Sequence, residues 1–99
     1  MIAIVARVKV QGGKESTFEA EARKMITYVR EHEPDTTFYV CLQSTGDPTV
    51  FTFYEEYESD EAMTTHGGSE AIKVFFGAIG GILDGQPSIE TFKQIDAKR

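Results

Sequence analysis

His66 is the residue of this sequence best suited to acid–base chemistry, because histidine titrates nearest to neutral pH. It ends the segment YEEYESDEAMTTH, residues 54 to 66, directly before two glycines. One interpretation is a base in a substrate pocket. The other is a histidine that stabilises the C-terminal end of a helix through the helix dipole. Because that electrostatic reason holds without catalysis, the residue alone favours the structural role.

Glu55, in the same segment, is a second candidate for chemistry. It alternates with Phe53 and Tyr57, so it lies on the same face of a predicted strand. If that face is covered, the carboxylate needs a partner or a place at the sheet margin. Arg7, midway along the first predicted strand, is the expected partner. The pair is either a structural ion pair at a dimer edge or a clamp for a substrate anion, and we favour the structural pair.

Several aromatic side chains could line a flat cavity for an aromatic ring. They are Tyr39, Phe53, Tyr54, Phe75 and Phe76. Aromatic residues at strand or helix spacing are more often simple core. We expect one or two of them to contact a ligand.

Other kinds of site are poorly supported. The only histidines, His32 and His66, lie on different predicted elements, and no carboxylate has a ligand-like spacing to either. The glycines of GAIGG, residues 77 to 81, lie in a helical stripe and lack the context of a nucleotide-binding loop. The sequence therefore predicts no metal and no cofactor.

Length and composition limit the possible classes of protein. Ninety-nine residues predict one domain, residues 1–99. A formal net charge of -6 argues against nucleic acid or an anionic membrane as a partner. Cys41 is the only cysteine, so an internal disulfide is impossible and a reducing compartment fits best. The sequence begins without the pattern of a signal peptide or membrane span, and we expect a cytoplasmic protein.

The first half of the chain predicts a strand, a helix and a two-stranded hairpin. Their residues are 2–10, 14–30, 36–44 and 49–57. The strands alternate or are rich in β-branched and aromatic residues, whereas the helix repeats its apolar residues at helical spacing. TGDP, residues 45 to 48, forms the hairpin turn. Ser16 with Glu19 could form a capping box at the start of the helix, unless the helix starts a residue or two earlier.

The second half predicts a helical region in two pieces and a last strand, residues 88–95. Ser59 and Ser69 are the expected N-caps of the two pieces, which are separated by Gly67 and Gly68. The second piece carries a wide apolar stripe over residues 72–83 and three glycines, Gly77, Gly80 and Gly81. Each glycine costs about 1 kcal/mol relative to alanine. The glycines could allow close packing on a neighbour or leave space for a small pocket. They could also simply make this helix less stable without serving a purpose.

The element order β-α-β-β-α-β predicts an α+β, ferredoxin-like fold, an antiparallel sheet with its helices on one face. Apolar side chains occupy both faces of the second and third strands. The helices can cover only one face, so the other needs a second cover. The simplest cover is a second copy of the chain. We therefore expect a homodimer whose two sheets enclose a barrel-like core.

Four segments together resemble the antibiotic biosynthesis monooxygenase superfamily, the dimeric α/β-barrel group. They are IAIVARVKVQGGKESTFEA, EHEPDTTFYV, GDPTVFTFYEEYESDEAMTTH and SIETFKQI. The third carries that family's most recognisable pattern, a strand glutamate followed by a short helix that ends in histidine. Each segment alone is weak, but their order and spacing together are fairly specific for the fold.

The resemblance implies a monooxygenase that oxidises a small quinol or phenol with O2 and without a cofactor. The pocket would lie between the sheet and helices of each protomer and hold a small aromatic molecule. His66 would accept a proton, and Arg7 or Tyr54 would hold the developing oxyanion. The alternatives are a non-catalytic small-molecule-binding dimer, or an isomerase or cyclase on the same scaffold.

Overall fold

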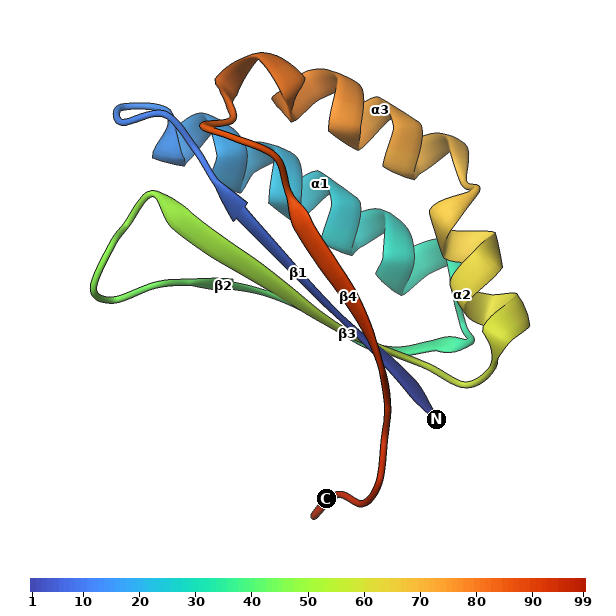
Figure 1. The fold of residues 1–99 in the computed structure, drawn as a ribbon. Helices are drawn as coiled ribbons and strands as arrows, with labels where there is room; N and C mark the ends of the chain where they lie inside the picture. Colours follow the sequence, from blue (N-terminus) through green and yellow to red (C-terminus); the bar gives the residue numbers. More distant parts are fainter.

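An antiparallel sheet with every helix on one face makes up the fold (Figure 1). The computed structural model describes residues 1–99. The elements in chain order are β1 Ile2–Lys9, α1 Glu15–His32, β2 Thr36–Gln43, β3 Val50–Tyr57, α2 Asp60–Gly67, α3 Glu70–Ile79, a 3-10 turn Gly80–Ile82, and β4 Ser88–Lys93. The four strands lie in the order β2-β3-β1-β4. The predicted ferredoxin-like α+β fold is confirmed, and within one chain the sheet is open rather than closed into a barrel.

The central strands β1 and β3 divide their side chains between the two faces of the sheet. Ala6 lies opposite Phe53, and both belong to the face that packs against the helices. The next pair, Val5 opposite Tyr54, belongs to the other face. Because side chains alternate along a strand, this register fixes the face of every other residue in β1 and β3.

The hydrophobic core lies between the helices and the sheet. Phe18 of α1 is fully buried at its centre, with ring centroids 4.5 Å from Phe51 and 6.0 Å from Phe75. The buried cluster comprises Val8, Val10, Phe18, Ala22, Met25, Val29, Phe51, Phe53, Phe75 and Ile79. The apolar stripe of α1 therefore packs as predicted, and so do Phe75 and Ile79 of α3, whereas Phe76 of the same stripe is 40% exposed.

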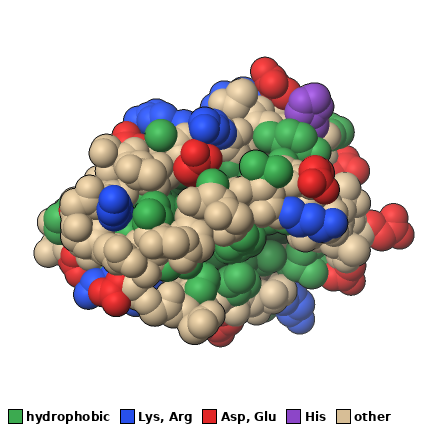
Figure 2. Space-filling view, turned by 90° about the horizontal axis from the view of Figure 1, so that it is seen from above, with side chains coloured by type: hydrophobic (Ala, Val, Ile, Leu, Met, Phe, Trp, Pro, Cys, Tyr) green, Lys and Arg blue, Asp and Glu red, His purple; other side chains and the backbone are tan.

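The second face of the sheet carries no helix (Figure 1). It exposes large apolar side chains, including Phe38 at 46% and Leu42 at 51% of their surface. The helix face, seen in Figure 2, instead mixes hydrophobic, acidic and basic side chains. The expectation of a sheet that is apolar on both faces is confirmed. None of the helices has the length and apolar character that a membrane span requires.

Two predicted helix caps are present and one is absent. The Ser59 hydroxyl accepts from the backbone N–H of Ala62, and the Ser69 hydroxyl accepts from that of Ile72. The capping box of Ser16 is wrong, because α1 already begins at Glu15 and has no side-chain cap. A serine inside the helix cannot cap it.

The glycines of the last helical region do not pack closely. Gly77, Gly80 and Gly81 are exposed, and a Cβ added at each would meet no atom within 4 Å. They face solvent, so the expectation of close packing is wrong and they leave no room over the sheet. Glycine is required at two turns instead, since Gly13 and Gly85 have φ angles of 90° and 95°.

Matched valine substitutions test the position of the core. Val10 is 0% exposed and Val74 is 62% exposed. Val10→Ala should lower the free energy of unfolding by about 2 kcal/mol, because it removes buried methyl groups and leaves a small cavity. Val74→Ala should change it by less than about 0.5 kcal/mol. Urea denaturation of both variants measures the difference, and equal losses would contradict this core.

A buried acid–histidine cluster as candidate functional site

His66 lies in the last turn of α2 with its ring inside the protein, only 5% exposed. Its Nδ1 is 2.8 Å from Oε1 of Glu33, and its Nε2 is 3.8 Å from Oε1 of Glu55. A carboxylate only accepts hydrogen bonds, so Nδ1 carries a proton that it donates to Glu33. His66 therefore sits between two buried acids rather than in solvent at a helix end.

Local structure brings these three residues together from three elements. Glu33 is the residue at the C-terminal end of α1, Glu55 lies on β3, and His66 comes from α2. The cap at Ser59 fixes where α2 begins. The hydroxyl of Ser69 donates to the backbone carbonyl of His66 at 2.8 Å and holds the end of that helix.

Glu33 has one satisfied oxygen and one free oxygen. Its Oε1 accepts from Nδ1 of His66 and from the hydroxyl of Thr36 at 2.9 Å. Its Oε2 is buried and has no hydrogen-bond partner, the only such side-chain nitrogen or oxygen in the protein. A buried polar atom without a partner is costly, so this oxygen requires an explanation.

Glu55 and Tyr57 alternate on β3 and point to the same side. The Tyr57 hydroxyl donates to Oε1 of Glu55 at 2.5 Å. Burial raises the pKa of the Glu55 carboxyl, against the opposing effects of this hydrogen bond and of His66. Two carboxylates and one imidazole thus share an enclosed space, and this space carries negative charge unless it holds two extra protons.

Tyr39 of β2 completes the cluster. Its ring centroid is 5.1 Å from that of His66 and 5.4 Å from that of Phe53. Burial, followed by the negative charges of Glu55 and Glu33, raises the pKa of the Tyr39 phenol. The hydroxyl therefore stays protonated and can donate a hydrogen bond.

A cavity of about 340 Å³ opens beside this cluster, between the end of α1 and the start of β2. Its walls are Ile26, Val29, Arg30, Glu33, Pro34, Thr36, Thr37, Phe38 and Tyr39. Glu33 and Tyr39 thus belong to both the cluster and the cavity. A molecule in this cavity would lie against Glu33 and Tyr39, whose carboxylate and phenol are groups that can accept a proton and donate a hydrogen bond. No set of three His, Cys, Asp or Glu side chains is arranged as a metal site requires.

The structure brings most of the predicted site residues to one side of the sheet. His66, Tyr39, Phe53, Glu55 and Phe75 all lie on the helix face, in or beside the core. Phe76 lies outside it on α3, 40% exposed, with its ring 5.6 Å from that of Phe75.

Arg7 lies on the opposite face of the sheet from Glu55. It is exposed and pairs in register with Thr52, whereas Glu55 pairs with Ile4. The expected ion pair between Arg7 and Glu55 is therefore wrong, because an odd separation along β1 turns Arg7 away. The partners of Glu55 are Tyr57 and His66.

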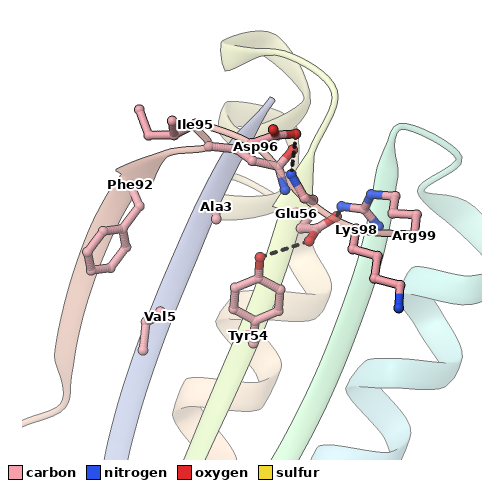
Figure 3. Close-up of a pocket in the computed structure, with 11 residues that line it drawn as sticks. Ala3, Val5, Tyr54, Glu56, Phe92, Ile95, Asp96, Lys98 and Arg99 are labelled. Atoms are coloured by element: carbon pink, nitrogen blue, oxygen red, sulfur yellow. Dashed lines mark hydrogen bonds and ion pairs between the residues drawn. The ribbon is translucent and has the colours of Figure 1, made fainter.

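Tyr54 also lies on the open face. Its hydroxyl donates to Oε2 of Glu56 at 2.8 Å, and Arg99 pairs with the other oxygen of Glu56 (Figure 3). This group borders a second cavity of about 370 Å³ between the sheet and the C-terminal segment. Within one chain, neither Tyr54 nor Arg7 can act on a molecule held beside His66.

Sequence reasoning missed Glu33, Thr36 and Tyr57 as members of the site. A signal for Glu33 was available, since an acid at the C-terminal end of a helix opposes the helix dipole. A residue placed against its local preference often serves a tertiary or functional purpose. Tyr57 carried no comparable signal, because a strand tyrosine is ordinary core.

Comparison with known proteins agrees with the fold and with the order of these elements. The family model described as antibiotic biosynthesis monooxygenase matches residues 1–78. A crystal structure that carries this family name, from Caulobacter crescentus CB15, is 30% identical with a TM-score of 0.91 and covers 96% of this chain and 90% of that one. A second, from Nitrosomonas europaea, is 20% identical with a TM-score of 0.89 and covers 97% of this chain and 100% of that one. No curated protein matches this chain significantly in sequence.

The burial of Tyr39 predicts a change in stability at alkaline pH. The unfolded chain loses the phenol proton near the ordinary pKa of 10.0, whereas the folded chain keeps it. Each such tyrosine lowers the free energy of unfolding by about 1.4 kcal/mol per pH unit above this pKa. In Tyr39→Phe, the free energy of unfolding should fall less steeply with pH above this pKa, by about 1.4 kcal/mol per pH unit. Urea denaturation above about pH 10 measures the slope, and an unchanged slope would contradict the burial of this phenol.

Proposed function

This chain belongs to the antibiotic biosynthesis monooxygenase family, and we propose that it oxidises a small quinol or phenol with O2 and without a metal or flavin. The observation that supports this activity is the pairing of Glu33 with His66 at the wall of a cavity of about 340 Å³. Cavities of this size suit small ligands. The family match supports a monooxygenase, and the cluster supplies the acid–base groups.

The reaction needs only proton removal from an electron-rich ring. A hydroquinone that loses a hydroxyl proton can pass one electron to O2, which gives a substrate radical and superoxide. These recombine at a ring carbon to form a peroxide, which loses water and leaves a carbonyl. The net change is one hydroquinone plus one O2 to one hydroxyquinone plus one water. The protein has to accept the proton, hold the anion and exclude bulk water.

Glu33 and His66 act together as the proton acceptor in this proposal. Oε2 of Glu33 belongs to the residue that lines the cavity, while His66 lies behind it and donates to Oε1. A proton that reaches Glu33 reduces the excess negative charge of the cluster, which favours its transfer. His66 thus accepts the proton through Glu33 rather than by direct contact with the ring.

Tyr39 holds the oxyanion in this proposal. Its phenol keeps its proton because of burial and the nearby acids, and it lines the same cavity. A fixed donor near the developing negative charge stabilises the transition state. Tyr39 takes the role first expected of Arg7 or Tyr54, which lie on the other face of the sheet.

A binding protein without catalysis is the second candidate. The supporting observation is that both ring nitrogens of His66 face carboxylates, as in a structural network. In this case the cavity would sequester a small aromatic molecule without converting it.

A homodimer is the second part of the proposal. The open face exposes Phe38, Leu42 and Phe92 in each chain, and an exposed apolar surface of this kind is typical of an interface. A second copy offers the same face by two-fold symmetry, so the two sheets can cover each other. The cavity beside Glu33 lies at the β2 edge of the sheet and shares Phe38 with the open face, so such a dimer would border it.

Oxygen uptake with 1,4-dihydroxynaphthalene tests the activity. We expect the protein to convert it to 2-hydroxy-1,4-naphthoquinone and water with one O2 consumed per turnover. Glu33→Gln should lower kcat by about 100-fold or more, because it removes the proton acceptor and keeps the side-chain shape. Glu31→Gln, the same change at an exposed position of α1, should leave kcat unchanged.

Two results of this assay would reject the oxidation. Uptake equal to the spontaneous background would leave the binding protein as the explanation. Conversion of a substrate without uptake of oxygen would instead indicate an isomerase or cyclase.

Sedimentation at micromolar concentration tests the dimer. The wild type should sediment as a dimer, and Leu42→Asp should sediment as a folded monomer because it places a charge on the open face. Val74→Asp is the matched control, since Val74 is exposed on α3 and should leave the dimer intact. A well-folded wild-type monomer at micromolar concentration would reject the interface.

A further inference from the structure

Residues 94–99 lie beside the open face of the sheet but are attached to it at only two points. They follow β4, form no helix or strand, and lie on the side of the sheet away from the helices (Figure 1). The backbone N–H of Gln94 donates to the carbonyl of Met1, and Arg99 pairs with Glu56 (Figure 3). Between these points a cavity of about 370 Å³ lies between the segment and the sheet.

The apolar side chain of this segment is left without a cover. Ile95 is 86% exposed, which makes it the most exposed large apolar residue of the chain. An ion pair with an exposed member adds little stability, whereas ordering a segment of several residues costs conformational entropy. Contacts within one chain are therefore too few to hold residues 94–99 in place.

Glu56 is the residue of the open face that depends on this segment. Its side chain is only 6% exposed, and its two oxygens accept from Tyr54 and Arg99. An enclosed carboxylate without a cation is costly, so Glu56 requires a positive charge at this place. It lies one residue before the end of β3 and therefore belongs to the rim of the open face.

The rim around Glu56 matches the chemistry of the segment. Phe38 pairs with Glu56 in register across β2 and β3, and it is 46% exposed. An acid and an exposed aromatic ring thus lie side by side, and the segment offers an apolar Ile95 and a basic Arg99. A second copy on the open face brings an identical segment to this rim by two-fold symmetry.

The gap between two packed sheets limits where the segment can lie. Sheets that pack face to face are about 10 Å apart, and their side chains fill this gap. A segment that stays across its own sheet would hold the second sheet away. At the rim, by contrast, a segment can cross to the other chain and leave both faces free to meet.

We propose that residues 94–99 are exchanged between the two chains of the homodimer. Arg99 pairs with Glu56 of the second copy, and Ile95 packs beside its Phe38. The inference rests on the proposed homodimer and is independent of the oxidation. Because Phe38 also lines the cavity at Glu33, the exchanged segment of one chain borders the candidate site of the other.

Opposite charge reversals in two separate variants test the exchange. Glu56→Arg and Arg99→Glu each bring like charges together, and each should weaken the homodimer by about 10-fold or more. An equimolar mixture of the two variants should form a heterodimer about as tight as the wild-type dimer, since every contact between the chains then joins opposite charges. Pairs within one chain cannot give this rescue. Sedimentation over a dilution series measures the dissociation constants.

Two controls accompany the mixture. Lys98→Glu makes the same change of net charge at the neighbouring exposed cation, which does not pair with Glu56. It should dimerise like the wild type and should fail to rescue Glu56→Arg. Glu56→Arg and Arg99→Glu combined in one chain should restore the homodimer, which verifies that neither change prevents folding.

Ile95→Asp tests the apolar half of the contact without disturbing the core, because this side chain is exposed in one chain. It should weaken the dimer by about 10-fold, since it removes a buried apolar side chain from the interface. Ile89→Asp is the matched control. Ile89 is 58% exposed on β4 and pairs with Ala6, so it belongs to the helix side of the sheet and should leave the dimer intact.

Failure of the exchange and failure of the homodimer give different results. A wild-type chain that sediments as a folded monomer would reject both. A wild-type dimer whose charge-reversed variants show no gain on mixing, or dimerise as tightly as the wild type alone, would overturn the exchange and leave the dimer. Rescue of Glu56→Arg by Lys98→Glu would also overturn it, because general charge attraction would then explain the mixture.

Discussion

The contact between His66 and Glu33 is a buried polar link between the end of α1 and the end of α2. The other ring nitrogen of His66 lies 3.8 Å from Glu55, which brings β3 beside this link. Removing one partner of a buried hydrogen bond typically costs about 1 to 3 kcal/mol, since the other group is left unsatisfied. The small helix α2 is therefore fixed against the sheet by polar groups.

The same cluster explains why a site can exist at this edge of the sheet. Most of the helix face is apolar core around Phe18. At the end of α1 the packing changes from apolar to polar, and a cavity lies between that helix end and β2. Enclosed acids at the wall of such a cavity have stronger electrostatic effects than acids in water. The fold thus supplies the frame, and the proposed chemistry involves only a few residues at one end.

The two faces of the sheet serve different purposes in this view. The helix face contains the core and the acid–histidine cluster, while the open face carries Phe38 and Leu42 with no cover within the chain. The similar solved structures share this arrangement of sheet and helices, and the one at 20% identity shows the fold alone. Function depends on the particular groups at the site. In the proposed function those groups are Glu33, His66 and Tyr39.

Some features could be predicted from local patterns alone. Alternation and helical spacing gave the order of the strands and helices, and Ser59 and Ser69 were recognisable as caps because a cap involves residues only three positions apart. The two apolar faces of the sheet were also visible, since alternation places residues without knowledge of their neighbours. His66 was identifiable by its chemistry.

The partners of His66 could not be predicted, because they depend on strand register and on where the helices dock. Glu33 lies 33 positions away in sequence, and nothing local indicates that it meets the imidazole. Arg7 was wrongly paired with Glu55 because a shift of one residue in β1 moves a side chain to the other face. The sequence by itself determined the elements and their apolar faces. Tertiary packing alone decided which acids enclose the histidine, because long-range contacts are set by the whole core and not by any one segment.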